Sequence, residues 1–128
     1  MEVYKILNGG DNFCYYVTMD KSKGGVFFDV WEPQKAQQFL QTMGITTPPH
    51  AIITTHKHYD HAGGNVQMKQ MYPNIQIIGG ADDKVPGETM GVQDKQVIEV
   101  DGLKIMFYHT PCHTVGHICT YITPAAGD

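Results

Sequence analysis

The chain has few cysteines, no long apolar run and no cluster of basic residues. Its three cysteines, Cys14, Cys112 and Cys119, are an odd number without Cys-x-x-Cys spacing. This argues against a disulfide framework and favours a reducing, cytoplasmic compartment. No apolar stretch approaches the length of a membrane span, and the first residues show no charged-then-apolar signal pattern. With a formal net charge of −4 over 128 residues, we expect neither a nucleic-acid nor a membrane partner.

Apolar periodicity and turn residues predict one domain that contains both strands and helices. We expect strands at 2–7, 12–18, 25–30, 51–54, 75–78, 96–100, 103–108 and 118–122, and helices at 33–43 and 64–71. Asp101-Gly102 is a hairpin signal, and residues 20–24 form a polar turn between strands. Residues 81–94 show little periodicity and are expected to be mostly loop.

The polar run that follows the apolar stretch 51–54 is rich in metal-binding side chains. It contains His56, His58, Asp60 and His61 within six positions, and Gly63-Gly64 follows. In extended backbone, residues two apart point the same way, so His56 and His58 are expected to face one point. The turn that follows would let Asp60 and His61 face a second point. Imidazole and carboxylate donors suit zinc or iron, and the run therefore predicts a metal centre.

Two simpler explanations of this run remain as alternatives. One is a polar loop that happens to contain histidines, and the other is a purely structural zinc site. Structural zinc sites favour closed, cysteine-rich tetrahedra, which the cysteine spacing here does not offer. A second histidine-rich segment, 109–117, follows the strand-like run 103–108. Pro111 and Gly116 predict that it is a loop, and spacing alone does not decide which of its histidines completes the first site.

Together these segments resemble the metallo-β-lactamase superfamily, and within it the glyoxalase II (hydroxyacylglutathione hydrolase) family. The superfamily pattern Thr-His-x-His-x-Asp-His, followed by Gly-Gly-Asn, occupies residues 55–65. The segment 109–119 is similar to a glyoxalase II segment, as are the shorter stretches 11–16 and 78–80. The similarity extends over nearly the whole chain, from about residue 3 to residue 123.

The resemblance implies a site for two divalent metal ions, with zinc expected first and iron or manganese as alternatives. The implied ligands are His56, His58 and His113 for the first metal, and Asp60 and His61 for the second. Asp60 would also orient the nucleophile and is the implied catalytic residue.

The remaining residues near these motifs have less definite roles. His109 and His117 match positions that are not ligands in the family, so we expect them to pack and hydrogen-bond locally. Cys112 is expected to be a packed thiol. Asp29 matches an aspartate behind the metals. It would either orient a ligand imidazole or simply begin a turn or helix.

The resemblance implies an α/β fold (of α+β type), the αββα sandwich, of which this chain would form only the N-terminal half. That half would be a mixed sheet with helices on one face. Its inner sheet face would lack a partner layer, which predicts self-association or marginal stability. Pro124 predicts a turn, so Asp128 is expected to be a loop end and not the family's metal-bridging aspartate. The C-terminal remainder and the helical glutathione-binding domain would be missing.

The activity implied by the resemblance is metal-dependent hydrolysis of S-(2-hydroxyacyl)glutathione, such as S-lactoylglutathione, to glutathione and a hydroxy acid. We expect the present chain alone to be weak or inactive, since part of the site would be missing. Two alternatives remain: a persulfide dioxygenase that uses one iron on the same fold, and a metal-binding fragment without catalytic activity.

Overall fold

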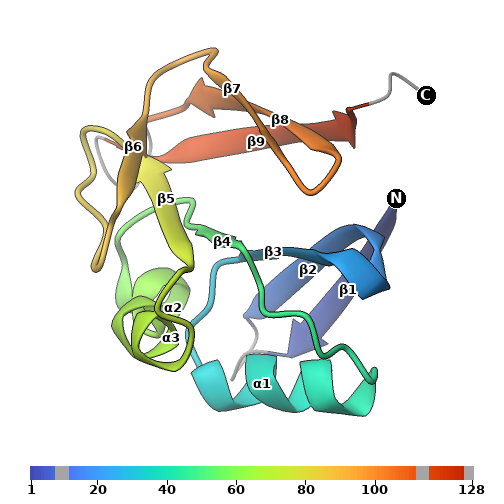
Figure 1. The fold of residues 1–128 in the computed structure, drawn as a ribbon. Helices are drawn as coiled ribbons and strands as arrows, with labels where there is room; N and C mark the ends of the chain where they lie inside the picture. Colours follow the sequence, from blue (N-terminus) through green and yellow to red (C-terminus); the bar gives the residue numbers. More distant parts are fainter. Residues whose placement is uncertain (8–11, 112–115, 126–128) are drawn as a thin grey trace.

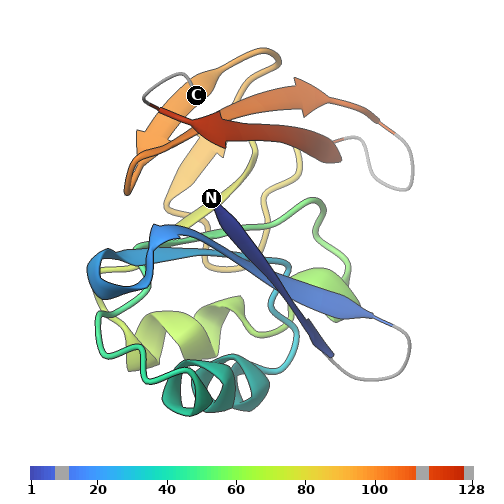
Figure 2. The same ribbon diagram turned by 90° about the vertical axis from the view of Figure 1, so that its right-hand side faces the viewer.

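The protein is built in three layers, as seen in a computed structural model that describes residues 1–7, 12–111 and 116–125. Helices α1 (Pro33–Thr42), α2 (Tyr59–Ala62) and α3 (Asn65–Met71) cover one face of a six-stranded sheet (Figure 1). A three-stranded sheet covers the other face (Figure 2). None of the helices in the described residues is long and apolar enough to cross a membrane.

The larger sheet is mixed, as the sequence predicts. Its strands follow chain order: β1 (Glu2–Leu7), β2 (Phe13–Asp20), β3 (Gly24–Phe28), β4 (Ala51–Ile53), β5 (Gln76–Gly80) and β6 (Met90–Val92). The first three are antiparallel, and β3 to β6 run parallel. The turn between β2 and β3 contains the short 3-10 helix η1 (Lys21–Lys23), where the Asp20 carboxylate accepts a hydrogen bond from the Ser22 backbone at 2.9 Å.

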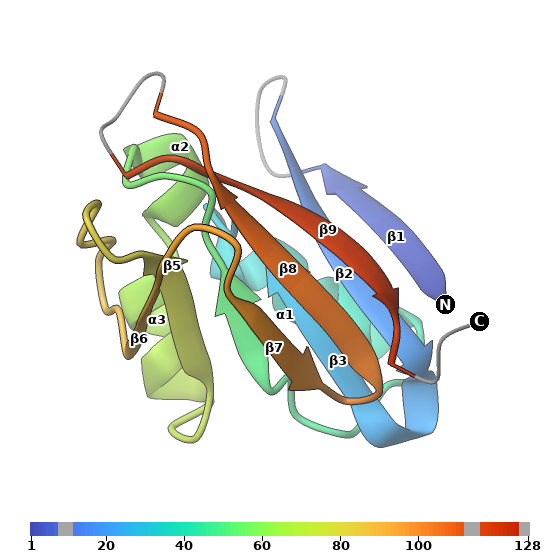
Figure 3. The same ribbon diagram turned by 90° about the horizontal axis from the view of Figure 1, so that it is seen from above.

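The smaller sheet is an antiparallel meander that lies across the larger one (Figure 3). Its strands are β7 (Val97–Val100), β8 (Leu103–His109) and β9 (Ile118–Pro124). The predicted Asp101-Gly102 hairpin is confirmed, with φ of 52° and 79° at its two turn residues. Pro124 ends β9 instead of lying beyond it, because its position at the strand end tolerates a missing backbone donor.

The sheet–sheet interface has its own apolar core. Val26, Ile53 and Ile78 of the larger sheet pack against Ile105 and Phe107 of the smaller one. The expectation of an uncovered inner face is therefore wrong, because strands β7 to β9 of this same chain supply the partner layer. The expectation placed all strands in one sheet, whereas the chain forms two sheets that pack face to face.

The second core lies between the larger sheet and the helices. It includes Tyr16, Phe27 and Ile52 from the sheet, and Leu40 and Met68 from the helices. The α/β class and the helices on one face are as predicted. Two short elements are not: helix α2 lies within the histidine run, and strand β6 lies within the expected loop 81–94. Both are too short for their periodicity to show in the sequence.

Candidate metal centre

The site lies at one edge of the larger sheet, where three parallel strands end. Strands β3, β4 and β5 are paired in parallel, so their carboxyl ends meet at the same edge. Asp29 directly follows β3, and Thr54-Thr55-His56 follows β4. The ladder continues for one more residue on each strand, because the backbone N–H of Asp29 donates to Ile53 and that of Thr54 donates to Ile78, both at 2.9 Å. Side chains from separate strands are thereby brought together.

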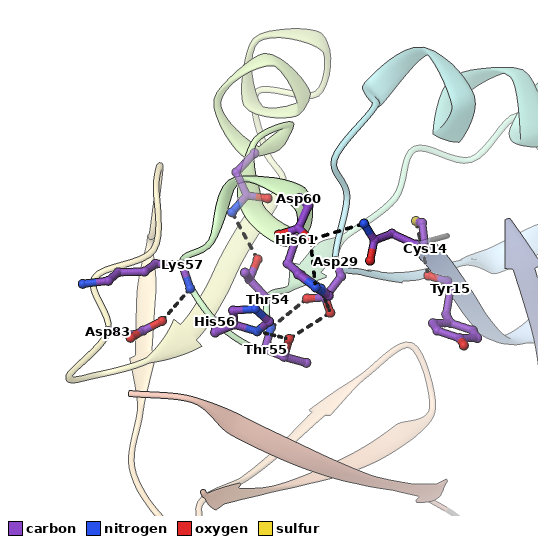
Figure 4. A network of polar contacts seen from close by, with 12 residues as sticks. Cys14, Tyr15, Asp29, Thr54, Thr55, His56, Lys57, Asp60, His61 and Asp83 are labelled. Atoms are coloured by element: carbon purple, nitrogen blue, oxygen red, sulfur yellow. Dashed lines mark hydrogen bonds and ion pairs between the residues drawn. The ribbon is translucent and has the colours of Figure 1, made fainter. Parts of the chain in front are cut away.

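Asp29 connects the two ends of the histidine run (Figure 4). Its carboxylate accepts hydrogen bonds from the backbone N–H of Thr55 at 2.7 Å and from the Thr55 hydroxyl at 2.9 Å. It also accepts one from Nδ1 of His61 at 3.0 Å. Its φ of 57° is a left-handed conformation that aspartate adopts more readily than most residues. Of the two roles considered for Asp29, the structure therefore supplies the contact that orients an imidazole.

His56 is the most buried imidazole of the run, with 5% of its surface exposed. Its Nδ1 lies 3.0 Å from the Thr55 hydroxyl, which already donates its proton to Asp29. Nδ1 of His56 must therefore be the donor, and this leaves Nε2 deprotonated and able to bind a metal. Burial, together with the neighbouring His61, lowers the pKa of His56 to about 4, which keeps the ring neutral at neutral pH.

His61 and Asp60 are carried by the short helix α2. The hydrogen bond from Nδ1 of His61 to Asp29 raises the pKa of His61 and directs its Nε2 toward the side of Asp60, 3.7 Å from that carboxylate. Asp60 is itself held from the β2 side, where Nδ2 of Asn12 donates to it at 3.2 Å. Ligand atoms of His56, Asp60 and His61 all lie within 4.8 Å of one another. Two imidazoles and a carboxylate at this separation fit a zinc, iron or manganese ion.

The other predicted ligands lie around this group or outside the described residues. The exposed ring of His58 lies at a right angle to that of His56, with 4.9 Å between the ring centres. It is not within the 4.8 Å group, and its role as a ligand stays a prediction. His113, Cys112 and Asp128 fall outside the described residues, and so do the predictions made for them. Lys57 and Tyr59, which alternate with the histidines of the run, are exposed.

The second histidine segment contacts the first. The ring of His117 lies 5.0 Å from that of His56, and its Nδ1 is 3.0 Å from the Thr110 hydroxyl. The backbone N–H of Ile118 donates to the carbonyl of Thr55 at 2.9 Å. The local hydrogen bonding expected of His117 is confirmed. His109 is exposed at the end of β8, where its backbone N–H donates to Asp94 at 2.9 Å.

Three contributors to the site were given no role from the sequence. Asn65 is fully buried, and its amide donates to the Thr54 hydroxyl and to the Pro86 carbonyl, both at 3.1 Å. Asn12 was noted only as part of a similar stretch, not for its contact with Asp60. Asp83 is buried and bonds to the histidine run. Its position could have been found, because it follows β5, the next parallel strand after β4.

Comparison with known proteins agrees with this fold. The model of the metallo-beta-lactamase superfamily matches residues 46–125, and the chain belongs to that superfamily. Among curated proteins, the cytoplasmic hydroxyacylglutathione hydrolase of Arabidopsis thaliana is 34% identical over 130 aligned residues, covering 100% of this chain and 49% of that protein. A probable hydroxyacylglutathione hydrolase of Schizosaccharomyces pombe is also 34% identical, covering 89% of this chain and 44% of its own length. The chain thus spans about half the length of these relatives.

Solved structures share the fold at lower identity. A metallo-beta-lactamase with the HARLDQ motif from Cronobacter sakazakii superposes with a TM-score of 0.74 at 21% identity, covering 90% of this chain and 54% of that one. ETHE1 from Myxococcus xanthus superposes with a TM-score of 0.79 at 15% identity, covering 95% and 54%. The predicted metallo-β-lactamase fold and the similarity to hydroxyacylglutathione hydrolases are therefore confirmed.

Proposed function

We propose that the protein is a metal-dependent thioester hydrolase of the hydroxyacylglutathione hydrolase type. One observation carries this proposal. The potential metal-ligand atoms of His56, Asp60 and His61 lie close together, and Asp29 accepts a hydrogen bond from His61. The curated relatives that it matches support the substrate class, an S-(2-hydroxyacyl)glutathione such as S-lactoylglutathione. The products would be glutathione and a hydroxy acid.

The proposed ligands are those implied by the resemblance, namely His56, His58 and His113 for one metal and Asp60 and His61 for the other. When bound, a divalent metal such as zinc lowers the pKa of a water molecule to about 7 and polarises a carbonyl oxygen. The chain's own contribution is to hold the imidazoles of His56 and His61 in place. Burial keeps His56 unprotonated, and the Asp29 carboxylate fixes which nitrogen of His61 is free. Asp60, held by Asn12, would orient the attacking water toward the thioester carbon.

A cytoplasmic setting is part of the proposal. It is supported by the cysteine count of the chain and by the similarity to the cytoplasmic enzyme of Arabidopsis thaliana. Because the chain spans about half of its relatives, we propose that efficient turnover needs the remainder of the domain.

Metal binding is the first test. Metal-free protein is titrated with Zn²⁺ against a chromophoric competitor, and the bound metals are measured by elemental analysis. We expect His56→Ala and His61→Ala to abolish tight binding. The matched control is His50→Ala, which removes an imidazole that pairs with Asp101 outside the site. Tight binding that survives both site substitutions would contradict the proposed ligands.

Thioester cleavage is the second test. S-lactoylglutathione hydrolysis is followed for the present chain and for a chimera that carries the C-terminal half of the Arabidopsis relative. We expect feeble activity from the chain alone and turnover from the chimera that His61→Ala abolishes. A zinc-loaded chimera that folds but leaves the thioester intact would refute the substrate assignment. Oxygen uptake with an iron-loaded sample would favour the dioxygenase alternative.

A further inference from the structure

Asp83 is a buried carboxylate just beyond the end of β5, only 2% exposed. Its own backbone N–H closes a tight turn by donating to the Gly80 carbonyl at 2.9 Å. The neighbouring Asp82 is exposed and provides a matched reference. An ionised carboxylate at such a depth is costly unless hydrogen bonds compensate it, so its partners indicate why it is there.

The two oxygens of Asp83 accept from backbone donors of two different loops. Oδ2 accepts from the N–H of Lys57 at 2.6 Å, and Oδ1 accepts from the N–H of Gly116 at 3.2 Å. Figure 4 shows the contact with Lys57, whose side chain extends away from the site. Lys57 lies between His56 and His58, and Gly116 directly precedes His117. One carboxylate therefore joins the histidine run to the second histidine segment.

The second segment fits closely against this carboxylate. A Cβ atom at Gly116 would lie 2.3 Å from both Cβ and the backbone nitrogen of Asp83. A Cβ atom at Gly80 would lie 2.1 Å from the Gly116 carbonyl oxygen. Only glycines at both positions allow the backbones to approach this closely. Gly116 is thus fixed in a corner between the end of β5 and Asp83. The ring of the next residue, His117, lies 5.0 Å from that of His56.

We propose that Asp83 is a positioning residue that sets the distance between the two histidine loops and thereby preorganises the metal centre. This inference rests on the proposed metal-binding function and deepens it. The side chain of Asp83 acts through backbone donors, without being a ligand. Charge-assisted bonds from a carboxylate to backbone N–H groups are stronger than neutral ones, which suits a contact that must resist loop motion.

The decisive variant is Asp83→Asn, which keeps the size of the side chain but turns one acceptor into a donor that faces a backbone N–H. We expect its affinity for Co²⁺ or Zn²⁺ to fall about 10- to 100-fold, as for other groups that orient ligands. Circular dichroism is used to confirm that the variant is fully folded at the assay temperature. Asp82→Asn is the control and is expected to bind metal as the wild type does.

Hydrogen exchange of metal-free protein tests, independently of metal, the hydrogen bonds that Asp83 accepts from Lys57 and Gly116. In the wild type, the amides of Lys57 and Gly116 are expected to be protected, although both lie outside helices and strands. Asp83→Asn is expected to release at least one of them, because asparagine keeps only one side-chain acceptor, whereas Asp82→Asn leaves both protected. Fast exchange of these amides in the wild type would contradict the proposed role of Asp83, and this measurement needs no variant to fold. Wild-type protein that binds no metal while both amides are protected would count against the metal centre alone.

If Asp83 has a purely structural role, its substitution should leave the metal affinity unchanged. If folded Asp83→Asn releases either amide but binds metal with wild-type affinity, the positioning role is overturned. Gly116→Ala provides a second route, because its methyl group must push the segment away from Asp83. We expect it to weaken metal binding and to release the Gly116 amide, and wild-type affinity in this variant would contradict the proposal in the same way.

Discussion

The two sheets of this molecule differ in the number of faces that they bury. In the larger sheet, all three residues of β4 are buried, because helices cover one face and the smaller sheet covers the other. In β8 of the smaller sheet, Leu103, Ile105 and Phe107 are buried while Lys104 and Tyr108 are exposed. A strand covered on both faces needs a continuous apolar run, and a strand covered on one face needs alternation. The candidate site lies at the carboxyl ends of β3, β4 and β5, in the sheet that is covered on both faces.

The largest effects on stability should come from truncating buried side chains. In each sheet, two residues that are neighbours in one strand are compared. Ile52 faces the helices and Ile53 faces the smaller sheet, so alanine at either position should lower the free energy of unfolding by about 2–5 kcal/mol. In β8, Phe107→Ala should cost about 3–5 kcal/mol. The neighbouring Tyr108→Ala should cost far less, because that ring is 39% exposed. Urea denaturation measures all four. A Tyr108 effect as large as that of Phe107 would mean that something else covers the outer face.

The next largest effect is expected at Asp29, which follows β3 of the larger sheet. Asp29→Ala removes the acceptor for Thr55 and His61. A fully buried donor left without a partner costs about 1–3 kcal/mol, and these part-buried donors should cost less. Metal affinity should fall about 10- to 100-fold, because the His61 ring loses its orienting bond. Asp29→Asn is the control for backbone strain, since asparagine also tolerates the φ of 57°. Unfolding curves and Zn²⁺ titration measure the two effects, and equal metal affinity in all three proteins would contradict the orienting role.

A smaller effect is expected at Glu88, in the connection between β5 and β6. Burial raises the pKa of its carboxyl group, and its Oε1 has no hydrogen-bond partner among the described residues. The folded state therefore holds the proton more tightly than the unfolded state. The resulting stability is present below the unfolded pKa of about 4.3 and is lost as the pH rises through the folded value.

Glu88→Gln should accordingly be more stable than the wild type at neutral pH, and the advantage should vanish in acid. The difference should stay below about 1 kcal/mol, because the half-exposed side chain is partly screened by solvent. Urea midpoints at several pH values measure it. Glu99→Gln, an exposed position on β7, is the control and should show no such pH dependence. A Glu88→Gln variant that is less stable than the wild type at neutral pH would contradict the burial argument.

The last prediction concerns reactivity and not stability. It compares the rate of alkylation of one cysteine from each sheet. Cys14 of β2 is buried in the helix-side core, and burial raises the pKa of its thiol, whereas Cys119 of β9 is exposed on the outer face. Iodoacetamide should therefore alkylate Cys119 quickly and Cys14 only after unfolding. Peptide mass spectrometry assigns the modified positions. Rapid labelling of Cys14 in folded protein would show that the larger sheet is less protected than the structure indicates.

Much of the fold could be predicted from local patterns. The helix beginning at Pro33, the strand 51–54 and the Asp101-Gly102 hairpin are close to their observed positions, because each is specified by a few neighbouring residues. Strand β6 could not be predicted, since its three residues form a strand only by pairing with β5. The grouping of β7, β8 and β9 into a separate sheet was also missed, because strand partners are distant in sequence.

The candidate site shows the same division. The histidine run was evident from composition and spacing, and the structure brings His56, Asp60 and His61 together. The contacts of Asn12, Asn65 and Asp83 were not predicted, because a single polar residue is common and only its partner reveals a role. The contact of Asp29 with His61 was one of two open interpretations, and only the positions of both side chains distinguish them.

What the sequence by itself determined is the chemistry available at the site and the strand or helix character of most segments, because both depend on residues adjacent in the chain. What only the tertiary structure decided is which distant groups meet. The covered inner sheet face and the Asp83 link from Lys57 to Gly116 exist because two sheets pack and three strands end at one edge. Such contacts arise from the packing of the whole chain, and no short stretch of sequence encodes them.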